Sequence, residues 1–292
     1  MPNVNRLQIC VLPRSSLSRE GVVREMGSET PACPLCRQSI AASTPFIPGR
    51  VRCPCGMVFQ PEPDPALLNK FWEHHDYNDP ALYGPRRAPS FRNLVRSVES
   101  LLPRGRWLDI GCGSGYLLAE VVKNGWQGFG IDLSLTAVEI AKGEGLQVVC
   151  GRFPHDAPTG PFDVISMIYA LEYFEDSRSM LAECRARLMP GGLLALQLKN
   201  ISFWQYAERW CRTKNGIWCP PDIRSYSVKT IVKLLHLAGF ERVITTPAEL
   251  PGRRLSNAAF RLLAIAGLPL LSPSMIAIAR VPDDQGRSEK QP

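Results

Sequence analysis

From residue 90 onward, short apolar runs alternate with stretches whose apolar residues recur at helical spacing. The apolar runs predict strands at 106–110, 128–133, 147–150, 162–168, 193–199, 241–246 and 275–281. The helical spacing predicts helices at 91–101, 116–124, 135–144, 177–188 and 228–238. Strands and helices in this alternation are typical of βαβ units. The pattern therefore predicts an α/β fold with a Rossmann-like, doubly wound sheet of seven mainly parallel strands.

The part of the chain before residue 90 has a different character. Residues 1–28 have no sustained period and are predicted to be a disordered leader, and 29–60 is rich in cysteine, proline and glycine. Prolines punctuate 61–89, which we interpret as a connector. We expect the large domain to cover 90–282 and the polar residues 283–292 to form a flexible tail.

Composition limits the class of protein. A chain of 292 residues with 45% hydrophobic residues can bury one α/β core and still carry a smaller unit. The sequence has neither an apolar stretch of about 20 residues nor the apolar segment of a signal peptide, so we expect no transmembrane segment and a cytoplasmic location. A net charge of +7 favours an anionic partner, although a general basic excess identifies none; oligomeric state cannot be read from the sequence.

Four of the ten cysteines form a compact pattern, Cys33-x2-Cys36-x16-Cys53-x-Cys55. Two short turns, each supplying two thiolates, can bind a structural Zn²⁺ tetrahedrally, and so small a module needs a metal to fold. Free cysteines and a redox or disulfide pair are the alternatives. His74 and His75 are possible substitute ligands, but we place them in the connector or over the active site.

The clearest sign of chemistry is a glycine-rich turn between the first predicted strand and its helix, Asp109-x-Gly111-x-Gly113-x-Gly115. Glycines let the backbone approach a ligand closely. A carboxylate before the first glycine repels phosphate but suits an amine or a sulfonium. Asp132 ends the next strand and can accept hydrogen bonds from both hydroxyls of a ribose.

These residues resemble motif I of the class I S-adenosylmethionine-dependent methyltransferases. Two later segments are similar to further motifs of that class: 162–167 with 170–173, and the turn 188–192. The resemblance covers about 90–281 and implies a seven-stranded sheet whose last strand is antiparallel. It also implies a cofactor site made by Asp109, Gly111, Gly113, Gly115, Asp132, Leu133, Phe153 and Tyr169, with Leu133 and Phe153 near the adenine and Tyr169 beside the sulfonium.

Two positions depart from the family. Arg152 stands where an acidic residue usually binds the adenine amine, so we expect a backbone group to replace that contact. Glu172-Tyr173 stands where the ubiquinone-biosynthesis O-methyltransferases have a Glu-His pair that helps to bind a divalent metal. We therefore predict no catalytic metal.

The acceptor is expected at 200–227, between the fifth strand and the next helix. This segment has three tryptophans among basic residues, which can stack on a sugar or base while pairing with phosphate; the alternative is a helical lid with a packed aromatic face. It resembles methyltransferase lids with a Pro-Pro-x-His turn, and Asp222 takes the place of the histidine. Asp222, Tyr169 and Tyr173, in that order, are the candidate general bases. The apolar run 258–271 is interpreted as a helix on the sheet rather than as a lipid contact.

The first hypothesis for function is methyl transfer from S-adenosylmethionine to a small molecule, such as a sugar, a nucleotide-sugar or a secondary metabolite, with zinc as a structural metal. The alternative enzyme is an RNA methyltransferase, because Cys33-x2-Cys36 resembles the zinc module of ribosomal RNA guanine methyltransferases. Their second half has a histidine ligand, however, where this chain has Cys53-x-Cys55. A non-catalytic adaptor that binds S-adenosylmethionine is the third hypothesis.

Overall fold

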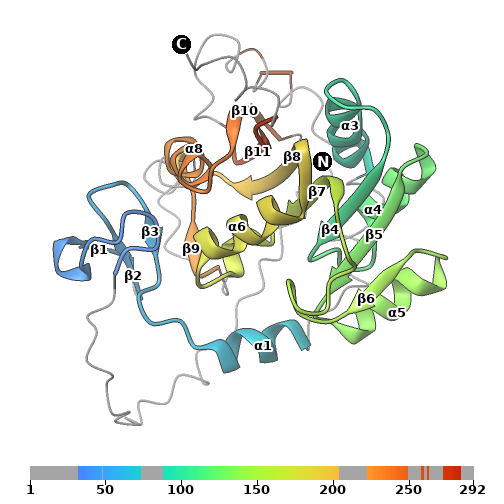
Figure 1. Cartoon of the computed structure of the whole chain (residues 1–292). Helices are drawn as coiled ribbons and strands as arrows, with labels where there is room; N and C mark the ends of the chain where they lie inside the picture. Colours follow the sequence, from blue (N-terminus) through green and yellow to red (C-terminus); the bar gives the residue numbers. More distant parts are fainter. Residues whose placement is uncertain are drawn as a thin grey trace, which may run out of the picture.

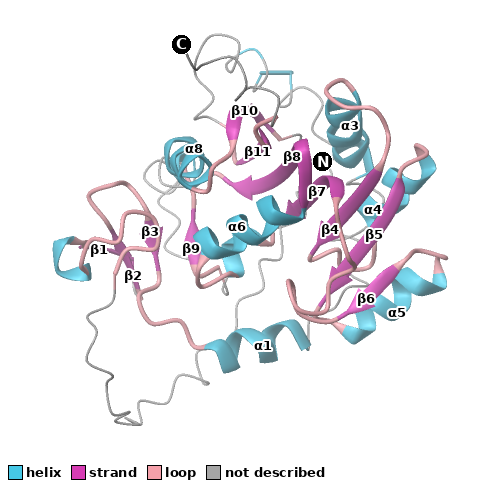
Figure 2. Cartoon of the chain, in the orientation of Figure 1, coloured by secondary structure: helices cyan, strands magenta, loops and turns pink. Residues whose placement is uncertain are grey.

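The structure is a computed structural model, shown in Figure 1 by position in the sequence and in Figure 2 by secondary structure. It describes residues 32–47, 49–73, 88–203, 222–248, 258–259, 262 and 272–283. The first elements are η2 (Ile40–Ala42), β1 (Thr44–Ile47), β2 (Arg50–Arg52), β3 (Val58–Phe59), α1 (Pro65–Glu73) and α3 (Ala88–Glu99). The alternating part comprises β4 (Arg106–Ile110), α4 (Tyr116–Lys123), β5 (Gln127–Asp132), α5 (Leu135–Gly143), β6 (Val148–Cys150), β7 (Phe162–Ile168), η4 (Leu171–Tyr173), α6 (Ser177–Arg187) and β8 (Leu188–Lys199). The last elements are β9 (Arg224–Ser225), α8 (Val228–Leu237), β10 (Glu241–Pro247) and β11 (Ser274–Arg280).

The large sheet has seven strands in the order β10-β11-β8-β7-β4-β5-β6. The five strands from β8 to β6 pair in parallel, whereas β11 runs antiparallel to both β8 and β10. This confirms the predicted Rossmann-like fold with an antiparallel last strand. The predicted bounds agree with the observed ones to within three residues, except at the start of β8. This strand begins at Leu188 because the turn before the predicted strand already pairs with β7.

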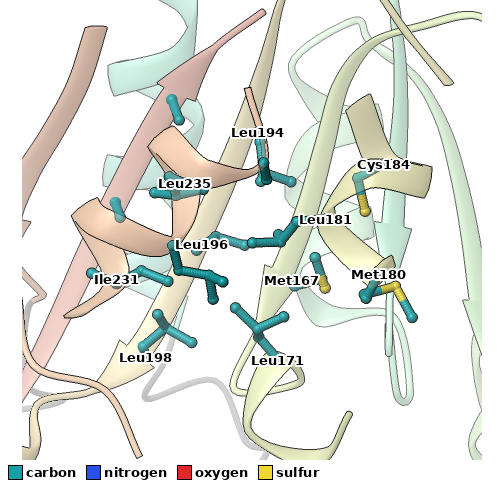
Figure 3. Close-up of a cluster of buried hydrophobic side chains, with 14 of the residues drawn as sticks. Met167, Leu171, Met180, Leu181, Cys184, Leu194, Leu196, Leu198, Ile231 and Leu235 are labelled. Atoms are coloured by element: carbon teal, nitrogen blue, oxygen red, sulfur yellow. The ribbon is translucent and has the colours of Figure 1, made fainter. Parts of the chain in front are cut away.

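Two apolar layers hold the helices against this sheet. Side chains of α6 and α8 cover one face and meet alternate residues of β8, including Leu194, Leu196 and Leu198 (Figure 3). Side chains of α3 and α4 cover the other face and meet Leu193 and Ala195 of the same strand. Because β8 is apolar on both faces, it lies in the interior of the sheet with helices on either side. This packing holds the carboxyl end of β8 in place.

A second, small sheet joins the cysteine-rich segment to the large domain. Its order is β1-β2-β3-β9, and β9 comes from 200–227, far along the chain (Figure 1). Val58 pairs with Ser225 and Phe59 with Arg224, while the amide of Gln60 donates to the carbonyl of Ile223 at 2.9 Å. This pairing could not be predicted from the sequence, because strands of two residues have no hydrophobic period. The boundaries at 29–60, 61–89 and 90–282 stay a prediction.

The connector contains a helix that the sequence did not predict. In α1 the ring of Trp72 lies edge-on to the ring of Tyr173, with centroids 4.7 Å apart. Tyr173 belongs to η4, just beyond β7, so α1 extends to the carboxyl end of the large sheet. Aromatic packing thus holds part of the connector against the large domain.

Several predictions fall outside the described residues. These are the leader 1–28, the tail 284–292, the pair His74 and His75, and 204–221, which holds the tryptophans of the expected acceptor segment. Of the apolar run 258–271, only 258–259 and 262 are described, in helical conformation. Within the described ranges, no helix has both the length and the apolar character needed to span a bilayer.

Candidate active site

The glycine turn after β4 has the backbone form that its sequence predicts. Gly111 and Gly115 both have positive φ, at +72° and +83°. A Cβ at Gly111 would lie 2.9 Å from the Cβ of Ala170, and one at Gly115 would collide with Leu146. The amide of Gly111 donates to the carbonyl of Ile131 at 2.8 Å, which ties the turn to the end of β5. Glycine is therefore required here both for conformation and for space.

A chain of hydrogen bonds holds the carboxylate of Asp109 in place. The indole Nε1 of Trp107 donates to Oγ of Ser166 at 2.8 Å, and this hydroxyl donates to Oδ1 of Asp109 at 2.6 Å. Among the described residues we find no donor to Oδ2. Burial raises the pKa of Asp109 to about 7, the bond from Ser166 opposes this rise, and nearby Asp132 adds to it. A buried carboxylate with one oxygen uncommitted is suited to bind a cation.

Asp132 closes the opposite side of the turn. Its Oδ2 accepts the amide of Gly113 at 2.8 Å and its Oδ1 accepts the amide of Ser134 at 2.9 Å. Burial raises the pKa of Asp132, and these main-chain bonds act against the rise. Each carboxylate oxygen retains a second lone pair, so the side chain can still accept the two hydroxyls of a ribose.

On the side of the site where we expect the adenine, a phenylalanine ring is buried and a leucine side chain is exposed. Leu133 is exposed, whereas Phe153 is buried and has the guanidinium of Arg187 5.4 Å from its ring centroid. The carboxylate of Asp156 folds back to accept the amide of Arg152 at 2.7 Å. The carboxylate of Asp156 therefore lies next to Arg152, the position at which the family usually has an acidic residue. Asp156 could not be recognised in the sequence, because it lies four positions beyond Arg152.

Tyr169 follows β7 and adopts an unusual backbone conformation, with φ of +53°. Its hydroxyl donates to Oγ of Ser274 at 3.0 Å and accepts Nε2 of Gln197 at 2.8 Å. Its amide donates to the carbonyl of Gln197 at 2.8 Å. A non-glycine residue held at positive φ stores strain, and such strain is concentrated at functional sites.

At the ends of β7 and β8 lies a cluster of charges that we call the acceptor-side cluster: the buried Glu172 and Asp222 with the partly exposed Lys199. The ammonium of Lys199 donates to both carboxylate oxygens of Asp222, at 2.7 and 2.9 Å, and the amide of Lys199 donates to Oε1 of Glu172 at 3.0 Å. The Oε2 of Glu172 is buried without a partner among the described residues. Burial and the charge of Asp222 raise the pKa of Glu172 to about 8, and Lys199 opposes them. Of these three residues, the sequence pointed to Asp222 alone as a candidate for catalysis.

The raised pKa predicts a pH-dependent stability. The ordinary pKa of glutamate is 4.5. Between pH 4.5 and about 8, therefore, Glu172 is protonated in the folded state and ionised in the unfolded chain. The stability contributed by this proton is complete below pH 4.5 and is lost as the pH rises through 8. Urea unfolding at about pH 5 and about pH 8.5 should show a larger loss for the native chain than for Glu172→Gln. Equal losses would contradict the assignment.

The four cysteines of the N-terminal segment converge. Their Sγ atoms all lie within 4.8 Å of one another, with Cys33 to Cys55 at 3.7 Å and Cys36 to Cys53 at 3.4 Å. Four sulfurs around a zinc with Zn–S bonds of about 2.3 Å stand about 3.8 Å apart. Burial raises the pKa of Cys33 and raises that of Cys55 to about 11, so these thiols stay protonated unless a metal displaces the protons. The cluster fits a zinc ion.

Comparison with known proteins identifies the family. The model of a family described as "Methyltransferase domain" matches residues 83–245, more than half of the chain. The chain belongs to this methyltransferase family. The matched residues include the glycine turn, Asp132 and the acceptor-side cluster.

Two curated relatives of the methyltransferase domain are ubiquinone biosynthesis O-methyltransferases. The one from Xanthomonas oryzae is 30% identical over 147 residues, which are 46% of this chain and 58% of the relative. The one from Methylococcus capsulatus is 34% identical over 126 residues, or 40% of this chain and 53% of the relative. The chain thus matches little more than half the length of these enzymes.

Solved structures agree on the fold. A Thermotoga maritima protein described as a SAM-dependent methyltransferase and possible histamine N-methyltransferase superposes with a TM-score of 0.53 at 19% identity, over 74% of this chain and 98% of its own. The N-methyltransferase NodS of Bradyrhizobium japonicum, solved with S-adenosylhomocysteine, gives 0.50 at 14% identity, over 74% and 98%. At these identities the likeness supports the class I methyltransferase fold alone.

Proposed function

We propose that this protein transfers the methyl group of S-adenosylmethionine to a small molecule, with a sugar, a nucleotide-sugar or a secondary metabolite as the acceptor class. The observation that carries the proposal is the buried Asp109 carboxylate, oriented by Ser166 beside a turn whose glycines have positive φ. This arrangement suits an ammonium and disfavours phosphate. The curated relatives are named ubiquinone biosynthesis O-methyltransferases, which supports a small-molecule acceptor.

The residues of the proposed site divide the work of binding. Oδ2 of Asp109 would pair with the methionine ammonium, Asp132 with the ribose hydroxyls, and Phe153 with Leu133 would border the adenine, with Asp156 offered to its amine. When bound, S-adenosylmethionine supplies a methyl group already activated on a sulfonium sulfur. The chain therefore has chiefly to position the acceptor in line and exclude water.

Proton removal is needed when the acceptor is a hydroxyl or an acidic carbon. Asp222 is our first candidate base, and the ammonium of Lys199 donates to both its carboxylate oxygens. The acceptor would have to displace the ammonium from one oxygen to reach it. Tyr169 would instead position the acceptor, because Ser274 and Gln197 already engage its hydroxyl. Tyr173 stacks edge-on with Trp72 and would form part of the acceptor wall.

Calorimetric titration with S-adenosylhomocysteine tests the cofactor assignment. Binding in the micromolar range, about −8 kcal/mol, would support it. Absence of binding by folded protein would refute it and favour a role without methyl transfer. Screening hydroxylated, anionic small molecules as acceptors would then define the substrate.

The pKa of Asp109 predicts how this binding varies with pH. In the free protein the carboxyl group is half protonated near pH 7, and only the ionised form can pair with an ammonium. The affinity for S-adenosylhomocysteine should therefore decrease about tenfold for each pH unit below 7 and level off above it. Calorimetry from about pH 5.5 to 8.5 measures this. Asp109→Asn is the matched control, and its weaker affinity should not vary over the same range.

Zinc at Cys33, Cys36, Cys53 and Cys55 is part of the proposal, as a structural metal with no place in the chemistry. The sulfur separations and the burial of two of the thiols support it. A reducing compartment, the cytoplasm, follows as the proposed location, because thiols that pair as disulfides cannot bind a metal.

A further inference from the structure

Arg224 of β9 is a buried cation whose hydrogen bonds all go to main-chain carbonyls. Its Nη1 donates to the carbonyls of Gln60 and Ile223, each at 3.0 Å, and its Nη2 to that of Glu175 at 2.7 Å. Its Nε is buried and has no partner among the described residues. The side chain thus holds two segments together yet retains one unsatisfied donor.

The charge of Arg224 is also incompletely balanced. No described carboxylate lies within 4 Å of its guanidinium; of the two acidic residues that attract it from further away, Glu175 and Asp176, the second is paired with Arg37 at 3.3 Å. Burial lowers the pKa of Arg224, while Tyr226, Glu175, Asp176 and Cys33, when charged, act against this. A buried charge without a close partner destabilises the fold. Such a residue needs a compensating anion.

The cysteine cluster would supply this anion when it holds a metal. Four thiolates around Zn²⁺ form a doubly negative centre. Phe59 packs against Arg224, with its ring centroid 5.9 Å from the guanidinium carbon, and Cys33 is among the groups whose charge acts on Arg224. Arg224 and Cys33 are both buried, so the attraction between the two charges is screened weakly.

We propose that Arg224 is the counter-charge of the metal-loaded cysteine cluster, and that metal loading thereby fixes β9 and the acceptor-side cluster. The proposal rests on the zinc and acceptor sites proposed above. It makes the N-terminal module a part of the methyltransferase site, and Arg224 a positioning residue that acts through β9.

The path from the metal site to the acceptor side is short. Arg50 of β2 donates to Oγ of Ser225 at 3.0 Å and also to the carbonyl of Asp222. The amide of Ile223 donates to the carbonyl of Glu172 at 3.0 Å. Asp222, held by Arg50 at its carbonyl and by Lys199 at its carboxylate, therefore changes position when β3 and β9 separate. Loss of the metal should loosen this contact.

Zinc affinity tests the role of Arg224 without any acceptor. We would compare the native chain with the neutral variants Arg224→Gln and Arg224→Met, the charge-retaining Arg224→Lys, and the control Arg37→Gln, by competition with a chromogenic chelator. The control removes the exposed ion pair that joins the same module to Asp176. We expect the neutral variants to bind zinc about 10–100-fold more weakly, the lysine variant to recover part of this loss, and the control to change less than about twofold.

Cobalt substitution and hydrogen exchange provide the readouts that packing alone would not change. The absorption of tetrahedral Co²⁺–thiolate should shift in Arg224→Lys, even if the neutral variants fold poorly. In the native chain, removal of the metal should speed amide exchange at 222–227 but leave 106–115 protected. Two results would overturn the inference: native-like zinc affinity in a folded neutral variant, or amide exchange at 222–227 that has the same rate with and without the metal.

Titration with S-adenosylhomocysteine on the same samples separates the two proposals. A native chain that binds S-adenosylhomocysteine but no zinc overturns the counter-charge and leaves the cofactor site standing. A chain that binds zinc with the expected Arg224 dependence but not S-adenosylhomocysteine supports the counter-charge and refutes methyl transfer.

Discussion

Substitution of Asp109 by alanine should weaken binding of S-adenosylhomocysteine by at least about tenfold, and by up to about 150-fold. A hydrogen bond to a charged group contributes about 1.5–3 kcal/mol, and Oδ2 of Asp109 is the group we assign to the methionine ammonium. Calorimetric titration at about pH 8, where the native carboxyl is ionised, measures the loss.

Two further variants separate loss of the charge from loss of structure. Asp109→Asn keeps the side chain's shape and can keep the bond to Ser166, so it should bind the ligand nearly as poorly as the alanine variant while unfolding at a similar urea concentration. Ser166→Ala removes the donor that orients the carboxylate at 2.6 Å and should cost less affinity. If Asp109→Asn bound the ligand like the native chain, the ammonium would have to be held elsewhere.

The parts of the fold with a long hydrophobic period were predictable from the sequence. Enough apolar residues at strand or helical spacing identify the central strands β4, β7 and β8 and the amphipathic helices α3 and α8. The turn at 109–115 was recognisable because its chemistry depends on local residue types. These features depend on neighbours in the sequence, which is why a single sequence reveals them.

Features that depend on distant partners were not predictable. The pairing of β3 with β9 joins Phe59 to Arg224 across 165 residues, by way of strands only two residues long. The partnership of Lys199 with Asp222 and Glu172 arises where three segments meet. Arg224 looked in the sequence like one more basic residue of an acceptor segment, because neither its burial nor its carbonyl partners leave a local pattern.

Removal of one zinc ligand, as in Cys53→Ser, should have the largest effect on stability. A structural zinc of this kind contributes on the order of 10 kcal/mol to folding. Since 1 kcal/mol shifts the Tm of a domain of this size by about 2–4 °C, we expect a decrease of at least about 20 °C, with zinc content falling from about one ion per chain to nearly none. Calorimetric melting and metal analysis of one sample measure both quantities.

The effect should spread beyond the module because the module shares its core with the large domain. Cys33, Cys53 and Phe59 lie in the same apolar cluster as Tyr226 and Ile231, so loss of the metal exposes side chains on both sides of the contact. Two controls isolate the metal: Cys150→Ser changes an exposed cysteine outside the cluster, and Cys184→Ala changes a buried one on α6. The first should alter neither quantity, and the second should lower the Tm through its cavity alone while zinc stays at one ion per chain. Retention of zinc by Cys53→Ser, or its loss in Cys184→Ala, would mean that the four thiols do not form the metal site.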